Sequence, residues 1–145
     1  MGSAAGEDVK ALLAATAQVP PAPRLRQRLL VRVWFETNSA LLSEEAIWQV
    51  EAIGNILVQA EAGTVFVVEG HADSRGSKPY NRQLSRRRAE AVQRYLVEEC
   101  GITSERLRIQ ALGDAEPVAV GEHAGAWTMN RRVEAVQVQG KASCR

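Results

Sequence analysis

The stretch that decides the fold runs TVFVVEGHADSRGSKPYNRQLSRRRAEAVQRYL over residues 64–96. Its first part, Thr64–Glu69, is rich in valine and bounded by glycines, which predicts a strand buried on both faces. A turn-rich loop, Gly70–Tyr80, follows this strand. Apolar residues then recur at every third or fourth position, which predicts a helix over Asn81–Cys100, and Gly101 is suited to ending it.

The segments outside this stretch add three strands and one helix. Alternating side chains predict a strand over Val31–Phe35, and Ser43 is a suitable N-cap for a helix that buries one face. Two further strands are predicted over Leu107–Ala111 and Arg132–Val138, separated by a long loop, Gly113–Asn130. The order strand, helix, strand, helix, strand, strand predicts an α/β sandwich with two long helices packed on a mixed four-stranded sheet.

The chain of 145 residues is long enough for one domain with its own core. An alanine-rich segment, Asp8–Gln18, predicts a short N-terminal helix, and the prolines that follow it predict a linker. We therefore expect the N-terminal helix and the proline-rich linker over 1–25, the α/β domain over 26–140 and a flexible tail over 141–145.

The ends of the chain and its two cysteines leave alternatives open. Met1–Lys10 lacks the basic and apolar parts of a signal peptide, which fits either a cytoplasmic protein or a mature or trimmed form. No apolar run approaches the roughly 20 residues of a membrane-spanning helix. Cys100 and Cys144 are too few for a disulfide framework, and they either form one pair or stay as a packed and a loose thiol.

The net charge of the chain is too small to attract nucleic acid through the electrostatic field of the whole protein. Eighteen basic and seventeen acidic residues leave a formal net charge of +1. A local group of basic residues carries no interleaved aromatic residues, which is typical of a solvated helix face. Its members are Arg75, Lys78, Arg82, Arg86, Arg87 and Arg94. We expect no nucleic-acid partner.

One residue of the second helix conflicts with its surroundings. At about 100° per residue, Arg88 falls in the middle of the apolar stripe that runs from Leu84 to Leu96. A guanidinium in that position is costly without a partner, and we expect Asp73 in the preceding loop to be that partner. The pair is either a structural ion pair that pins the loop or a receptor for a zwitterion. In the second case Asp73 binds an ammonium and Arg88 binds a carboxylate.

Sequence motifs of common enzymes and metal sites are missing. The chain contains no GxSxG, P-loop or HExxH pattern, and no pair of carboxylates is placed for cleavage of a glycan. His71 and His123 lack metal-ligand spacing with the cysteines, and the ring of His71 is expected to bond to the backbone. We therefore expect a binding protein without catalytic residues, cofactor or metal.

Beyond these patterns, the sequence resembles a known family over about Val31–Val138. The resemblance is carried by Gly70-His71-Ala72-Asp73, Gly76, Tyr80-Asn81, Leu84-Ser85, Arg88-Ala89, Trp34-Phe35-Glu36, Asn38-Ser39-Ala40 and Asn130-Arg131-Arg132-Val133. These motifs resemble those of the OmpA-like domains, which are periplasmic peptidoglycan-binding domains. The resemblance implies the same α/β fold that the order of elements predicts.

The resemblance also implies non-covalent binding of the peptidoglycan stem peptide at its diaminopimelate. By motif position, Asp73 would accept from the ammonium and Arg88 would clamp the carboxylate. Asn38, Asn81 and Arg131 would add supporting hydrogen bonds. The implied protein is periplasmic or outer-membrane-associated, a monomer or a weak dimer, and associates with outer-membrane or envelope proteins. The alternative is a scaffold or protein-interaction domain that keeps the fold and has lost the ligand.

Some positions depart from the family pattern, among them Ala72, Glu36, where aspartate is commoner, Arg75 and the segment that ends at Trp127. Ala72 replaces the usual threonine before the aspartate, which removes one hydroxyl. Arg75 brings a positive charge close to Asp73, where it either competes with a ligand ammonium or reaches the glycan or a second carboxylate. Trp127 either stacks on a sugar or closes over the core. Arg132, which begins the last strand, is expected to be solvated.

Overall fold

The computed structural model of the protein describes residues 26–138. The N-terminal helix predicted over Asp8–Gln18, the proline-rich linker and the tail over 141–145 lie outside these residues and stay predictions, as does any pairing of Cys144. None of the helices within residues 26–138 is both long and apolar enough to cross a membrane.

Four strands form one mixed sheet accompanied by two long helices. The elements in chain order are β1 (Arg26–Trp34), α2 (Glu44–Gln59), β2 (Phe66–Gly70), α3 (Lys78–Glu98), a 3₁₀ turn η1 (Ser104–Arg106), β3 (Leu107–Ala111), α4 (Ala124–Asn130) and β4 (Arg132–Val138). The strand order is β1-β4-β2-β3. Strand β4 pairs antiparallel with β1 and β2, and β2 pairs parallel with β3. The predicted α/β sandwich is confirmed.

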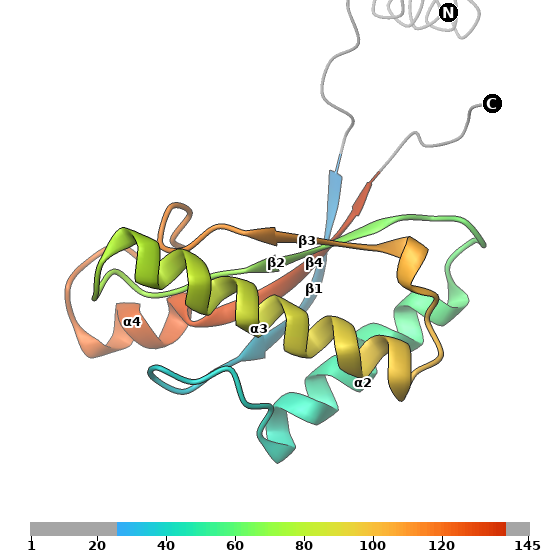
Figure 1. The fold of residues 1–145 in the computed structure, drawn as a ribbon, viewed down its shortest axis with the longest axis horizontal. Helices are drawn as coiled ribbons and strands as arrows, with labels where there is room; N and C mark the ends of the chain where they lie inside the picture. Colours follow the sequence, from blue (N-terminus) through green and yellow to red (C-terminus); the bar gives the residue numbers. More distant parts are fainter. Residues whose placement is uncertain (1–25, 139–145) are drawn as a thin grey trace, which may run out of the picture.

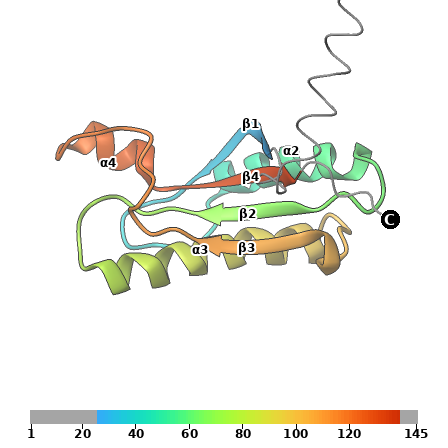
Figure 2. The same ribbon diagram turned by 90° about the horizontal axis from the view of Figure 1, so that it is seen from above.

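Both long helices lie on the same face of the sheet (Figures 1 and 2). Strands β1 and β2 are both antiparallel to β4, so they are parallel to each other. Helix α2 connects β1 to β2, and α3 connects β2 to β3, and both connections advance in the same direction across the sheet. Because such crossovers are right-handed, two that advance in one direction place their helices on one face.

The hydrophobic core fills the space between this face and the two helices. Strand β2 is buried along its whole length, which confirms the burial predicted for it. Each large apolar side chain that is fully buried stabilises the fold by about 1.5–3 kcal/mol. The buried side chains include Val33, Phe66, Val68 and Val133 from the strands and Ile53, Leu57, Val92 and Leu96 from the helices.

Serine side chains cap the N-termini of both long helices. Each Oγ accepts a hydrogen bond from the backbone N–H three residues later, at 3.0 Å for Ser43 and 3.2 Å for Ser77. The Ser43 cap is as predicted. The Ser77 cap starts α3 at Lys78, three residues before the predicted Asn81. Pro79 is tolerated there because N–H groups in the first turn have no partner within the helix.

The prediction of a continuous loop over Gly113–Asn130 is wrong in its second half, which forms helix α4. The helix is capped by His123, whose Nδ1 accepts a hydrogen bond from the Ala126 N–H at 3.3 Å. Seven residues are too few to show a periodic pattern, and histidine is not among the usual capping residues. The sequence therefore carries no clear signal for this helix.

Gly70, at the end of β2, allows α3 to approach the sheet closely. A Cβ atom at this position would lie 1.8 Å from the backbone carbonyl oxygen of Ser85 in α3. The atom in the way belongs to the backbone, so no change of side-chain rotamer relieves the clash. The position of α3 on the sheet therefore depends on the missing side chain of Gly70.

We predict that Gly70→Ala lowers the free energy of unfolding by about 3 kcal/mol, because α3 must move away from the sheet. Urea denaturation followed by circular dichroism measures this change. Gly125→Ala in α4 is the matched control, because its Cβ would make only an ordinary contact, 3.4 Å from the His123 ring. A Gly70→Ala variant as stable as wild type would contradict the close approach of α3.

Candidate functional site

Three segments meet at one end of the sheet and line a cavity of about 280 Å³. Strands β1 and β2 are parallel, so the loops that follow them lie at the same edge of the sheet, beside the first turns of α3 (Figure 1). Four of the predicted site residues, Asn38, Asp73, Asn81 and Arg88, line this cavity. The fifth, Arg131, lies just beyond its wall, with its Nη1 3.8 Å from the Asp73 carboxylate.

Arg88 projects from α3 into the interface between helix and sheet, and its exposed fraction is 0%. Its guanidinium donates to three backbone carbonyl groups. Nε bonds to Ser39 at 2.8 Å, Nη1 to His71 at 2.9 Å and Nη2 to Glu36 at 2.9 Å. A guanidinium has five N–H donors, so two are left after these bonds.

The buried guanidinium of Arg88 keeps its charge at neutral pH. Burial, and to a smaller extent the neighbouring charge of Arg131, lower the pKa of Arg88 to about 10. Asp73 partly offsets these effects. The cavity therefore contains a fixed positive charge that is held in place by the backbone.

The predicted ion pair between Asp73 and Arg88 is wrong, although both residues line the cavity. Asp73 Oδ1 accepts from the backbone N–H of Arg75 at 3.0 Å and from its Nε at 3.2 Å, and Oδ2 accepts from its Nη2 at 2.7 Å. Partial burial raises the pKa of Asp73, but the hydrogen bonds from Arg75 outweigh this effect, and the pKa lies below its ordinary value of 3.8. Arg75 takes the place of Arg88 as the partner of Asp73, because it lies only two residues away in the same loop.

The two predicted asparagines differ in how their side chains are engaged. Asn81 is 2% exposed, and its Nδ2 has no hydrogen-bond partner within residues 26–138. Asn38 adopts a positive φ of 55°, which asparagine tolerates, and its Oδ1 accepts from the Tyr80 hydroxyl at 2.9 Å. The buried amide of Asn81 is thus a donor without an acceptor at the cavity wall, which is costly unless a ligand supplies the acceptor.

The residues that hold Arg75 were not apparent from the sequence. Its Nη2 donates to the Thr37 hydroxyl at 3.2 Å, and its guanidinium carbon lies 4.2 Å from the centre of the Trp127 ring. Trp127 belongs to α4, the helix that the sequence did not reveal. The ring of Trp127 therefore packs on Arg75 beside the cavity.

The arrangement can hold a ligand with one positive and one negative group. Asp73 is the acceptor for a cation. Arg88, the amide of Asn81 and the N-terminal turn of α3 are donors for an anion. The two sets of groups line the same cavity, so a ligand that carries both charges close together fits it better than a single ion.

Comparison with known proteins gives the family. The sequence model described as the OmpA family matches residues 34–131, about two thirds of the chain. The chain belongs to the OmpA family. It is 39% identical over 107 residues to the peptidoglycan-associated lipoprotein of Pseudomonas aeruginosa, covering 74% of this chain and 62% of that protein. The chain thus spans about three fifths of the length of this curated relative.

Solved structures of OmpA-family proteins share the fold. The peptidoglycan-associated lipoprotein from Burkholderia pseudomallei matches with a TM-score of 0.65 and 29% identity, over 74% of this chain and 87% of that one. The structure described as the cell wall anchor of the T6SS from Pseudomonas aeruginosa matches with a TM-score of 0.61 and 29% identity, over 72% of this chain and 74% of that one.

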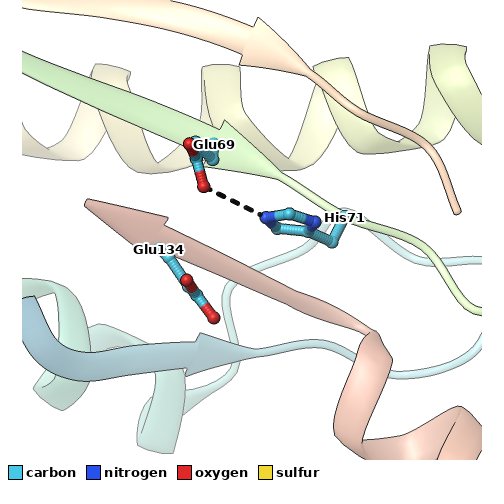
Figure 3. Close-up of side chains that lie close together, drawn as sticks. All are labelled: Glu69, His71 and Glu134. Atoms are coloured by element: carbon cyan, nitrogen blue, oxygen red, sulfur yellow. Dashed lines mark ion pairs between the residues drawn. The ribbon is translucent and has the colours of Figure 1, made fainter. Parts of the chain in front are cut away.

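A second polar cluster lies on the face of the sheet away from α2 and α3. Glu69, His71 and Glu134 come together there (Figure 3), with one donor atom from each within 4.8 Å of the others. These residue types could ligate a metal ion. However, Arg28 Nη1 lies 2.6 Å from Glu69 and 2.5 Å from Glu134, and Arg132 Nε lies 2.6 Å from Glu134.

The charges of this cluster do not fit a metal ion. Arg32 also reaches Glu134, at 3.0 Å, so three guanidinium groups surround two carboxylates. A cation would have to displace Arg28 and would add to an existing positive excess. We conclude that the cluster is a structural ion network within this OmpA-family domain.

Two predictions about this cluster are wrong. Arg132 is not solvated: it is 3% exposed, because strand alternation places it on the same face as Glu134, and its Nη2 donates to the Glu116 carbonyl at 3.0 Å. The ring of His71 does not bond to the backbone. Its two nitrogens have no hydrogen-bond partner within residues 26–138, although Nε2 lies 3.4 Å from Glu69.

We predict that Glu134→Gln lowers the free energy of unfolding at pH 7 by about 3 kcal/mol, because it leaves buried Arg132 without its carboxylate. Burial raises the pKa of Glu134, but Arg132 and Arg28 lower it more, so the pKa lies below 4.5. The contribution of the ionised carboxylate is therefore complete above pH 4.5 and is lost as the pH falls through the lowered pKa. Urea denaturation between pH 3 and pH 7 measures the difference.

Glu105→Gln is the matched control for this series, because Glu105 is exposed in η1 and the substitution removes the same charge. Its stability should stay within about 0.5 kcal/mol of wild type. A difference between wild type and Glu134→Gln that stays constant down to pH 3 would contradict the role of the ionised carboxylate.

Proposed function

We propose that this chain binds peptidoglycan non-covalently through the diaminopimelate of the stem peptide and so anchors itself, or an envelope partner, to the cell wall. The observation that carries the proposal is the cavity that contains both Asp73 and Arg88. The free end of diaminopimelate is an amino-acid head group with an ammonium and a carboxylate. A carboxylate and a guanidinium on one cavity are complementary to it.

Each polar group of the cavity has a part in this proposal. The ligand carboxylate takes the two N–H donors of Arg88 that the backbone leaves and the unpartnered amide of Asn81. The N-terminal turn of α3 adds partial positive charge. The ammonium binds Asp73. Asn38 Oδ1 accepts from the Tyr80 hydroxyl, and Arg131 Nε donates to the carbonyl of Phe35. Both bonds support the segments that form the cavity.

The relatives support the same conclusion. One is named a peptidoglycan-associated lipoprotein and another is described as a cell wall anchor. A chain that binds peptidoglycan acts in the periplasm, so we also propose an envelope location. The alternative of a scaffold that has lost its ligand is not favoured. In such a domain the unsatisfied amide and the buried charge in one cavity would cost stability with no ligand to offset the cost. Binding without catalysis also fits relatives that are named for association with peptidoglycan or for anchoring to the cell wall.

We predict that Asp73→Asn reduces the affinity for peptidoglycan about tenfold or more, because a charged hydrogen bond to the ligand ammonium is lost. Arg88→Lys should cause a similar loss, because lysine keeps the charge but cannot bond three carbonyls and a carboxylate together. Co-sedimentation with purified sacculi and calorimetry with free meso-diaminopimelate measure both effects.

Asp114→Asn is the matched control, because Asp114 lies in the loop after β3, pairs with Lys78 at the start of α3 and does not line the cavity. Circular dichroism must show that each variant is folded. If the variants at Asp73 and Arg88 sediment with sacculi as wild type does, the proposed function is wrong. Release of soluble fragments from sacculi by wild type would indicate a hydrolase instead.

A further inference from the structure

We propose that Arg75 makes this site selective for stem peptides that carry a second free carboxylate in addition to the head group. The proposal rests on the proposed function and adds a ligand class to it: a peptide with one ammonium and at least two carboxylates.

Arg75 links the two loops that line the cavity to α4, which lies beside it. Its Nε and Nη2 bond to Asp73 in its own loop, its Nη2 also bonds to Thr37 in the β1–α2 loop, and its guanidinium lies over Trp127 in α4. These bonds use the Nε–H and both hydrogens of Nη2. The two hydrogens of Nη1 are left, and 39% of the side chain is exposed. The guanidinium is therefore fixed in place at the cavity and still has donors to offer.

The charges at the cavity leave a positive excess. Arg75, Arg88 and Arg131 lie at or beside it, against Asp73 within it and Glu122, whose carboxylate is 3.4 Å from the Trp127 indole nitrogen. Of these five groups, which line the cavity or lie beside it, three are positive and two are negative. A simple zwitterion has no net charge and leaves this excess uncompensated, whereas a peptide with one more carboxylate compensates it.

A ligand ammonium at Asp73 competes with Arg75 for the same carboxylate. The carboxylate of Asp73 already accepts three hydrogen bonds from Arg75, and Arg131 lies 3.8 Å away. A carboxylate has about four acceptor positions, so about one is left, and an ammonium that makes more than one bond to Asp73 must displace part of the Arg75 fork. The ligand regains what this exchange costs only if it offers Arg75 a new acidic partner.

Trp127 and Thr37 keep the released guanidinium beside the ligand. A guanidinium over an indole ring is held by cation–π attraction whether or not Asp73 is occupied. The fork of Arg75 is then free in a geometry that suits a carboxylate bidentately. A ligand in which this second carboxylate is converted to an amide loses the charge and one of the two acceptor oxygens.

The test uses three synthetic probes: the tripeptide N-acetyl-L-Ala-γ-D-Glu-meso-diaminopimelate, whose only ammonium is that of the head group, the same peptide amidated at the glutamate α-carboxyl, and the same peptide amidated at the diaminopimelate carboxyl outside the head group. Calorimetry measures their affinities for wild type, Arg75→Gln and Arg86→Gln. Arg86 is exposed on α3, so its variant removes the same charge away from the cavity. Thermal denaturation checks that each variant is folded.

We expect wild type and Arg86→Gln to prefer the unmodified tripeptide over at least one amide by about threefold to tenfold. In Arg75→Gln this preference should fall to less than about twofold, while binding of the tripeptide persists. The proposal is overturned if wild type binds all three probes equally or if Arg75→Gln keeps the preference. It is also overturned if Arg75→Gln binds every probe more tightly, since Arg75 would then only compete for Asp73. Failure of wild type to bind any probe would instead refute the proposed function.

Discussion

The buried guanidinium of Arg88 is the interaction on which the rest of the site depends. Its three hydrogen bonds join α3 to the β1–α2 loop, through Glu36 and Ser39, and to the residue after β2, His71. These carbonyl groups come from segments far apart in the chain. Without Arg88, they would lose their partners in a place where an unpaired polar group costs about 1–3 kcal/mol each. One side chain thus fixes the shape of the cavity and supplies its positive charge.

Arginine serves as an internal connector throughout this domain. Arg106 bonds the carbonyls of Leu57 and Thr64, and Arg131 bonds that of Phe35. Arg132 bonds a carboxylate and a carbonyl on the opposite face of the sheet. A planar fork with five donors can bond several fixed acceptors at once, which the single ammonium of lysine does less well. The same property gives Arg75 its place between a carboxylate, a hydroxyl and an aromatic ring.

The sequence was sufficient to predict the layers of the fold and most of the cavity. Valine-rich and alternating segments gave the strands, and the anomaly of one charged residue on an apolar stripe pointed to Arg88. The predictions that were wrong concern residues whose partners depend on tertiary structure. Arg132 was expected to be solvated because its partner Glu134 becomes visible only when the face of the strand is known. Helix α4 is too short for a period, so the contact between Trp127 and Arg75 could not be foreseen. Asp73 was paired with Arg88 instead of Arg75, because helical periodicity describes positions on one helix and carries no information on contacts within a loop.

The position of β4 has a consequence for how the molecule is assembled. Within residues 26–138 this strand is the last element in chain order, yet it lies between β1 and β2 and pairs with both. As the chain emerges during synthesis, β1 therefore lacks its partner in the described sheet until β4 is made. The ladder closes late, through contacts between residues about a hundred positions apart, a topology associated with slow folding. A ribosome that stalls before Arg132 leaves two unpaired strand edges exposed, and such edges promote aggregation.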